Sequence, residues 1–192
     1  MNYLAHLALS GEQDEIMVGN FMADFVKGKK YKAYPEEIQK GIILHRKIDY
    51  YTDTHEIIGE GLQLIYKDHG KFSGILMDMY LDFFLARKFQ DIYDTSVSAF
   101  QTDAFKKLEK FSTVFPQPVD YMFTYMKKGK WLERYQTKNG LEKSLKGLSS
   151  RIKYENNIDD GITTLEKYHD ELEVVFDTFY PQIQNMCLEY IG

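Results

Sequence analysis

The stretch GIILHRKIDYYTDTH, residues 41 to 55, decides the fold class and also holds the most unusual side chains of this chain. The segment PEE, residues 35 to 37, precedes it and is typical of a helix start, because proline fits the first turn and acidic groups there complement the helix dipole. We therefore predict a helix that runs into the stretch. His45, Asp49 and Asp53 recur at every fourth position, so they line one side of that helix. An ordinary amphipathic helix has no need of such a set.

Three other apolar segments carry polar pairs with the same spacing. They are Asn2 and His6, Asn20 and Asp24, and Asp78 and Asp82. Each pair alone has an ordinary explanation, since a histidine on an apolar face is commonly a hydrogen-bonded core residue and an aspartate near a helix start is commonly a cap. The recurrence in four segments favours a shared site.

Helical spacing extends over most of the chain. Apolar residues three and four apart predict a helix from Asn157 to Phe179. Breaks between segments of helical length are indicated at Ser10-Gly11, Gly28, Gly70, Pro116, Pro118, Gly129, Asn139-Gly140 and Pro181. No segment alternates as a strand does. We predict an all-α fold of roughly eight to ten helices, in a single domain over residues 1–192.

Composition excludes several classes of protein. The net charge of −5, from 24 basic and 29 acidic residues, argues against a protein that coats nucleic acid. The lone cysteine, Cys187, excludes a disulfide framework and a cysteine-based zinc site, and it fits a reducing compartment. The N-terminal apolar run is too short to span a membrane and lacks a basic leader. We therefore expect a cytoplasmic protein with no membrane or nucleic-acid partner.

Asp78 and Asp82 lie within the nearly continuous apolar run GILMDMYLDFFLA, residues 74 to 86. Burying an unpaired carboxylate costs several kcal/mol or more, so these groups require a partner. A divalent cation neutralises several carboxylates at once, and a mixture of imidazole and carboxylate ligands suits Mn, Fe or Zn better than Ca. The polar pairs therefore predict a metal site.

These segments also carry a resemblance to a known family. MNYLAHLALSG, GNFMADFVKG, GIILHRKIDYYTDTH and DMYLDFFLARKF resemble the acyl carrier protein phosphodiesterases, a divergent branch of the HD-domain metal-dependent phosphohydrolases. WLERY (131–135), GLSSR (147–151) and FYP (179–181) extend the resemblance over nearly the whole chain. It implies an HD-domain-like helical enzyme, dependent on manganese, that removes the 4'-phosphopantetheine arm from holo acyl carrier protein and leaves the apo carrier.

On this resemblance the polar pairs form the walls of the metal site. The leading candidates, as ligands and as catalytic residues, are Asp24, His45 and Asp82. The candidates for further ligands or for supporting contacts are His6, Asp49 and Asp78.

Basic residues supply candidate contacts to the substrate. Arg46, Arg134 and Arg151 are candidate phosphate contacts, because a guanidinium can bind two oxygens at once, although ordinary surface ion pairing explains each of them equally well. The run VKGKKYK offers a basic patch for docking an acidic carrier, although such a run is also typical of a solvated loop. Its basic residues are Lys27, Lys29, Lys30 and Lys32.

One position departs from the family pattern. The family usually has histidine after the aspartate that corresponds to Asp82, whereas this chain has Phe83, which can neither bind a metal nor transfer a proton. Three hypotheses follow: the carrier phosphodiesterase itself, an HD-type hydrolase of a small phosphorylated molecule that makes no use of the lysine run, and a catalytically impaired carrier-binding homologue.

Overall fold

Helices account for all the regular structure in the computed structural model, which describes residues 1–192 and contains no strand. Eleven are α-helices, and five short 3-10 helices carry the label η. In chain order they are α1 (Tyr3–Ala8), α2 (Asp14–Met22), η1 (Ala23–Phe25), η2 (Gly28–Ala33), α3 (Glu36–Thr54), α4 (Glu56–His69), η3 (Gly70–Phe72), α5 (Ser73–Tyr93), α6 (Val97–Lys110), η4 (Ser112–Val114), α7 (Gln117–Gly129), α8 (Trp131–Arg134), α9 (Lys138–Ser149), η5 (Ile158–Asp160), α10 (Gly161–Lys167) and α11 (His169–Ile191). The predicted all-α fold is confirmed.

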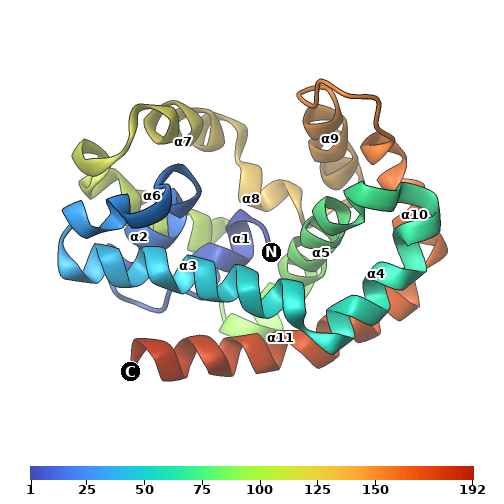
Figure 1. Ribbon diagram of the computed structural model, residues 1–192, viewed down its shortest axis with the longest axis horizontal. Helices are drawn as coiled ribbons and strands as arrows, with labels where there is room; N and C mark the ends of the chain where they lie inside the picture. The colour runs from blue at the N-terminus through green and yellow to red at the C-terminus, as the bar shows by residue number, and fades with distance from the viewer.

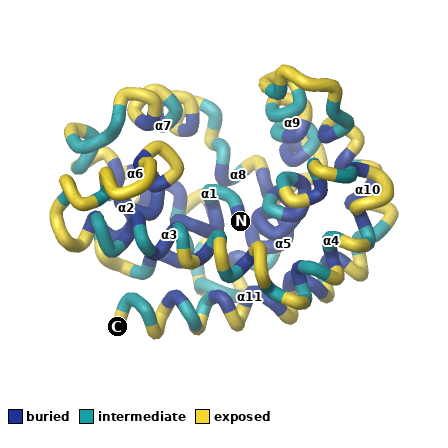
Figure 2. The backbone as a smooth tube through the Cα atoms, in the orientation of Figure 1, coloured by how far each residue is buried: buried dark blue, intermediate teal, exposed yellow.

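The short helix α1 lies near the middle of the molecule, with α3 passing in front of it in the view of Figure 1 and α11 running along one edge. Helices α7 and α9 stand apart on the opposite edge, on either side of α8. Buried backbone concentrates in α1, α2 and α5, as the dark segments of Figure 2 show. One continuous core of 48 buried apolar residues joins these elements, so the site described below rests on a common packed interior. None of the helices combines the length and apolarity that crossing a membrane requires.

Helices α2 and α3 approach each other unusually closely, and two glycines permit this. A Cβ added at Gly19 would lie 2.1 Å from the carbonyl oxygen of Ile38, and one added at Gly41 would lie 2.1 Å from that of Ile16. Real Cβ atoms do not come this close to backbone, so only glycine fits at either position. Asn20 follows Gly19 directly, and His45 lies one helical turn after Gly41, so the contact brings their side chains together.

The helix predicted to start at residues 35–37 is confirmed, since α3 begins at Glu36 with Pro35 as its N-cap. The predicted helix from Asn157 to Phe179 is wrong as a single element: η5, α10 and α11 cover this range, and the chain turns at Tyr168 (φ −118°, ψ 27°). The apolar spacing persists across that turn and therefore conceals it.

Pro181 does not separate two helices as the sequence predicts, because it lies inside α11. Proline removes one backbone donor from the helix, which leaves the carbonyl of the residue four positions earlier without its usual partner. That residue, Asp177, is exposed, so water can hydrogen-bond to its carbonyl group. The short helices α1, α8 and α10 bring the number of α-helices to eleven, above the eight to ten that the sequence predicts.

Candidate metal centre

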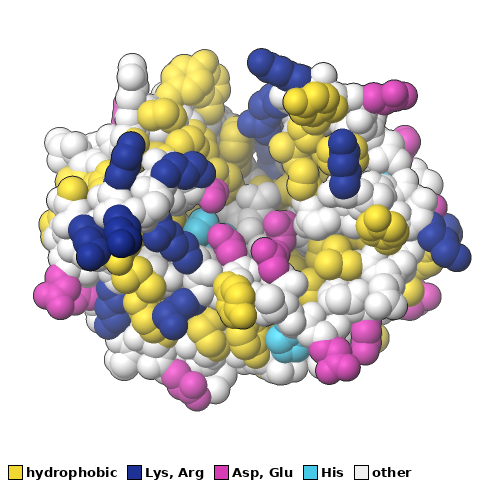
Figure 3. Space-filling view, viewed as in Figure 1, with side chains coloured by type: hydrophobic (Ala, Val, Ile, Leu, Met, Phe, Trp, Pro, Cys, Tyr) yellow, Lys and Arg dark blue, Asp and Glu magenta, His cyan; other side chains and the backbone are white.

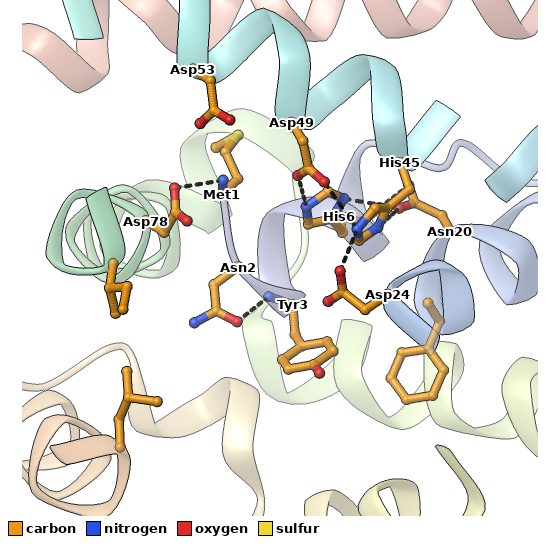
Figure 4. Close-up of a pocket in the computed structure, with 13 residues that line it drawn as sticks. Met1, Asn2, Tyr3, His6, Asn20, Asp24, His45, Asp49, Asp53 and Asp78 are labelled. Carbon is orange, nitrogen blue, oxygen red and sulfur yellow. Dashed lines mark hydrogen bonds and ion pairs between the residues drawn. The ribbon is translucent and has the colours of Figure 1, made fainter. Parts of the chain in front are cut away.

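A cleft of about 400 Å³ opens where α1, α2, α3 and α5 meet. We call it the acidic cleft, because four carboxylates and two imidazoles line it (Figure 4). They belong to Asp24, Asp49, Asp53, Asp78, His6 and His45. The structure thus brings together five of the six predicted metal ligands, all except Asp82, and adds Asp53.

The carboxylate of Asp49 lies between the two imidazoles. Its Oδ1 is 3.2 Å from Nε2 of His6 and its Oδ2 is 3.2 Å from Nε2 of His45. Asp24 approaches Nε2 of His45 from η1, with its Oδ1 also at 3.2 Å. The two rings are stacked, with centroids 4.0 Å apart. Two imidazole nitrogens and two carboxylates therefore converge on one small volume.

Asn20 determines which nitrogen each ring presents to this volume. The Nδ2 group of Asn20 donates to the carbonyl oxygen of His6 (2.8 Å) and to Oγ of Ser10 (2.9 Å), which fixes the orientation of the amide. Its Oδ1 therefore accepts from Nδ1 of His6 (2.9 Å) and from Nδ1 of His45 (3.0 Å). With protons on both Nδ1 atoms, the two Nε2 atoms face the carboxylates. This arrangement is typical of metal-binding histidines, whose outer nitrogen donates to a fixed acceptor.

The electrostatics of the two histidines differ. Burial lowers the pKa of His6 to about 4, and the neighbouring His45 acts in the same direction. Burial also acts to lower the pKa of His45, but hydrogen bonds to Asp24 and Asp49 outweigh burial and raise this pKa to about 9. Burial acts to raise the pKa of Asp49, but the contact with the charged His45, and to a smaller extent that with His6, holds this pKa well below its usual range. The positive charge of His45 thus lies between the carboxylates of Asp24 and Asp49, and a bound cation would take its place.

The donor set fits a divalent cation. The ligand atoms of His6, His45 and Asp49 all lie within 4.8 Å of one another, and Asp24 adds a carboxylate beside His45. Imidazole nitrogen together with carboxylate oxygen is the ligand combination of first-row transition metals. The group can therefore hold a divalent metal ion.

The remaining two carboxylates form the far wall of the cleft. Asp78 Oδ1 accepts from the amino group of Met1 at 2.7 Å. Asp53 projects from the last turn of α3, and burial together with the nearby Asp78 raises its pKa. Its four carboxylates outnumber the two positive groups beside them, His45 and the amino group of Met1, so the acidic cleft carries a net negative charge.

The structure does not bring Asp82 to the acidic cleft. Its carboxylate is fully buried under the start of α1, where it accepts from the backbone N–H groups of Leu4 (2.9 Å), Ala5 (3.2 Å) and Asn2 (3.3 Å). Burial raises the pKa of Asp82 to about 7, although these three hydrogen bonds favour the carboxylate. The backbone N–H groups at the start of α1 thus supply the partners that this buried acid requires, and the same helix carries His6.

Phe83 and Arg46 also lie away from the acidic cleft. The ring of Phe83 is fully buried, packs edge-on against Phe84 and lies beneath the guanidinium of Arg87. The guanidinium of Arg46 donates to the carbonyl oxygens of Val26 (2.8 Å) and Gly28 (2.9 Å), so it holds the loop between η1 and η2.

The two other predicted phosphate contacts, Arg134 and Arg151, line a second cleft of about 300 Å³. It lies between α1, α5, α7, α8 and α9, and we call it the side cleft. Asn2, Tyr3 and Leu148 line both clefts, so the two are adjacent and share a wall.

The predicted docking lysines lie in and just before η2, and their side chains are exposed. We call Lys27, Lys29, Lys30 and Lys32 the lysine segment. Figure 3 shows basic side chains gathered on the part of the surface that carries η2 and the start of α3, beside the acidic centre of the same face. Asp24, three residues before Lys27, joins the two regions.

Asn2, Asn20 and Asp53 belong to the polar series found in the sequence, but no specific role is predicted for them or for Tyr3; the structure places all four in the acidic cleft. Asn20 and Asn2 stand out in the sequence through their spacing, and Asp53 extends the series of His45 and Asp49. No signal in the sequence distinguishes Tyr3 from the other tyrosines.

Comparison with known proteins identifies relatives along nearly the whole chain. The family model described as acyl carrier protein phosphodiesterase matches residues 1–183. Proteins named acyl carrier protein phosphodiesterase from Yersinia pestis and from Klebsiella pneumoniae strain 342 are 31% and 32% identical over 188 residues, which is 97% of each chain. One from Salmonella paratyphi A is 32% identical over 184 residues, or 95% of each chain. No solved structure matches. The predicted resemblance is confirmed, and the chain belongs to the acyl carrier protein phosphodiesterase family.

Proposed function

We propose that this protein hydrolyses the phosphodiester that joins 4'-phosphopantetheine to a serine of holo acyl carrier protein. Water and the phosphodiester would give free 4'-phosphopantetheine and the serine hydroxyl of the apo carrier. The observation that carries the proposal is the convergence of Nε2 of His6, Nε2 of His45 and the carboxylates of Asp49 and Asp24 in one cleft. The names of the relatives support the choice of substrate.

We further propose that His6, His45, Asp24 and Asp49 hold a divalent cation, manganese in the first instance. When bound, such a cation polarises phosphoryl oxygens and lowers the pKa of water, which is the chemistry that hydrolysis of a phosphodiester needs. Asn20 keeps the Nε2 lone pairs directed at the site through its two hydrogen bonds to Nδ1. Asp82 positions His6 through its bonds to the backbone of α1.

The charge of the acidic cleft supports a cation-dependent reaction. Its four carboxylates outnumber the positive groups of His45 and Met1, so its net negative charge repels an anionic phosphodiester until a metal cation enters. Arg134 and Arg151 in the adjoining side cleft are the proposed phosphate contacts of the chain itself. The lysine segment is the proposed docking surface for the acidic carrier, and the reducing cytoplasm is the proposed location, in keeping with the single cysteine.

The position of Phe83 bears on the third hypothesis from the sequence. Its ring packs in the core and lines neither cleft, so a phenyl group there removes no polar group from the acidic cleft. The inference that this chain is catalytically impaired therefore loses its support.

The first experiment measures both metal and reaction. Holo acyl carrier protein is incubated with the purified protein and Mn²⁺, and mass spectrometry follows loss of the phosphopantetheine arm. We expect the wild type to produce apo carrier, and Asp49→Asn to lose both turnover and bound manganese while its circular dichroism spectrum is unchanged. Asp177→Asn, an exposed substitution on α11, is the control. Stoichiometric manganese in Asp49→Asn would contradict the proposed ligand set, and an intact holo carrier after incubation with wild type would contradict the proposed reaction.

A further inference from the structure

The side cleft differs in character from the acidic cleft that it adjoins. Its floor is apolar and sulfur-rich, formed by Met79, Met122, Trp131 and Tyr135. The cleft carries no carboxylate, although the acidic cleft next to it is lined by four. An extended ligand with a charged end and a mostly uncharged chain matches this arrangement, provided that its charged end lies at the junction of the two clefts.

Two hydrogen-bond donors at that junction have only weak acceptors. Nδ2 of Asn2 donates to the sulfur of Met79, and the hydroxyl of Tyr3 donates to the sulfur of Met122, both at 2.8 Å. A thioether is a poor acceptor, so an amide carbonyl oxygen would be a better partner for either donor. The side cleft therefore offers two donors for two carbonyl groups.

Cations border the same cleft. Arg134, Lys143 and Arg151 line it, and the guanidinium of Arg151 has only a backbone partner, the carbonyl oxygen of Gly147 at 2.9 Å. The ion pairs of this region are formed by Lys130 and Lys146 instead. The three lining cations form no ion pair and are thus available to an anionic group that enters the side cleft.

We infer that the side cleft receives the pantetheine arm of the substrate, an inference that rests on the proposed function. The 4'-phosphopantetheine arm has two amide carbonyls and a branched dimethyl group between its phosphate and its thiol. The carbonyls match the donors of Asn2 and Tyr3, the apolar carbons match the floor around Trp131, and the phosphate end lies at the junction with the acidic cleft. The carrier protein then stays outside, on the open face of the acidic cleft. The side cleft makes the arm, and not only the phosphodiester, a determinant of specificity.

The chain supplies its own probe for this inference. Trp131 is the only tryptophan and lines the side cleft, so its fluorescence reports occupancy directly. Free pantetheine, which has no phosphate, is the ligand for titration. We expect a saturable change in the emission of Trp131, with affinity reduced about fivefold to tenfold in Tyr3→Phe, the scale of one neutral hydrogen bond.

Gly147 provides a way to block the cleft. It lines the side cleft on α9, and a Cβ added there meets no atom within 4 Å, so Gly147→Phe introduces a ring at the cleft with no clash at its Cβ. Gly59→Phe on α4 is the matched control, because Gly59 is equally open and lines neither cleft. We expect Gly147→Phe to abolish the pantetheine signal and to lower kcat/KM for holo carrier at least tenfold, and Gly59→Phe to behave as wild type.

The two readouts separate this inference from the proposed function. If wild type cleaves holo carrier while pantetheine leaves Trp131 emission unchanged and Gly147→Phe keeps full activity, the arm does not occupy the side cleft and the inference is overturned. If pantetheine binds as described but wild type with Mn²⁺ leaves the holo carrier intact, the cleft assignment is supported and the proposed reaction fails.

Discussion

Asn20 shows how a single side chain can orient two candidate metal ligands without being one of them. One amide oxygen accepts hydrogen bonds from two imidazoles, and the amide nitrogen is held by the His6 carbonyl oxygen and by Ser10. All of these atoms are buried, so water does not compete for them. The tautomer of both histidines is therefore a property of the folded core.

We predict that Asn20→Ala lowers the affinity for Mn²⁺ by about 10-fold to 100-fold, the usual effect of removing the hydrogen-bond partner of a metal ligand. Without the amide oxygen, each ring can present either nitrogen to the cleft. Isothermal titration calorimetry gives the affinity, and Asn185→Ala, at an exposed position on α11, is the control. Unchanged affinity in Asn20→Ala would show that the ring orientation has another source.

Phe83→His tests the one position where the sequence departs from the family pattern. The ring of Phe83 is fully buried against Phe84, so an imidazole there lacks a polar partner and should lower the free energy of unfolding by about 1–3 kcal/mol. Because Phe83 lines neither cleft, we expect manganese affinity and turnover per folded molecule to stay at wild-type values. Denaturant unfolding and the mass assay measure the two effects, with Phe83→Leu as the apolar control. A gain in turnover would place this position in the chemistry.

The contact between α2 and α3 brings together residues that are separated in the sequence. Gly19 and Gly41 let the two backbones meet, which sets Asn20 and Asp24 beside His45. The site is therefore a product of helix packing, and loosening this packing should affect metal binding and stability together.

We predict that Gly41→Ala lowers the free energy of unfolding by about 1–3 kcal/mol or more, because its Cβ would meet the carbonyl oxygen of Ile16 and force the helices apart. Manganese affinity should fall with it, since Asn20 and His45 move relative to each other. Gly59→Ala, in open space on α4, should instead raise stability by up to about 1 kcal/mol through helix propensity. Equal unfolding midpoints for the two variants would contradict the close contact.

The elements also show what sequence patterns can and cannot predict. The start of α3 was predictable because its signals are local, whereas the turn at Tyr168 was not, because the apolar spacing continues through it. Four-residue spacing predicted a shared site for His6, Asp24, His45 and Asp49, and the structure brings these four side chains together in the acidic cleft. The same spacing also predicted Asp82 as a ligand, but in the structure Asp82 accepts hydrogen bonds from the backbone of α1. No pattern in the sequence of α5 reveals these partners.

Charge is divided between two regions on one face of the molecule. The protein is acidic overall, with a net charge of −5, and the acidic cleft concentrates negative charge at the site of the proposed reaction. The lysine segment beside it reverses the local sign (Figure 3). An acidic carrier would be repelled by the protein as a whole and attracted at this edge, which orients it toward the cleft.

We predict that replacing Lys27, Lys29, Lys30 and Lys32 together by glutamine weakens binding of the acidic carrier by about tenfold, because exposed ion pairs contribute up to about 1 kcal/mol each and four are removed. The wild-type affinity should fall as salt is raised, since exposed charges are screened, and the variant should show a smaller dependence on salt.

The control replaces four other exposed lysines that line neither cleft, Lys67, Lys71, Lys106 and Lys128, with the same change in net charge. The parent protein, the lysine-segment variant and the control all carry Asp49→Asn as well, which is expected to prevent hydrolysis, and calorimetry measures their binding of the carrier. An equal loss of affinity in the control would mean that net charge alone attracts the carrier, and equal affinity in all three at every salt concentration would place the docking surface elsewhere.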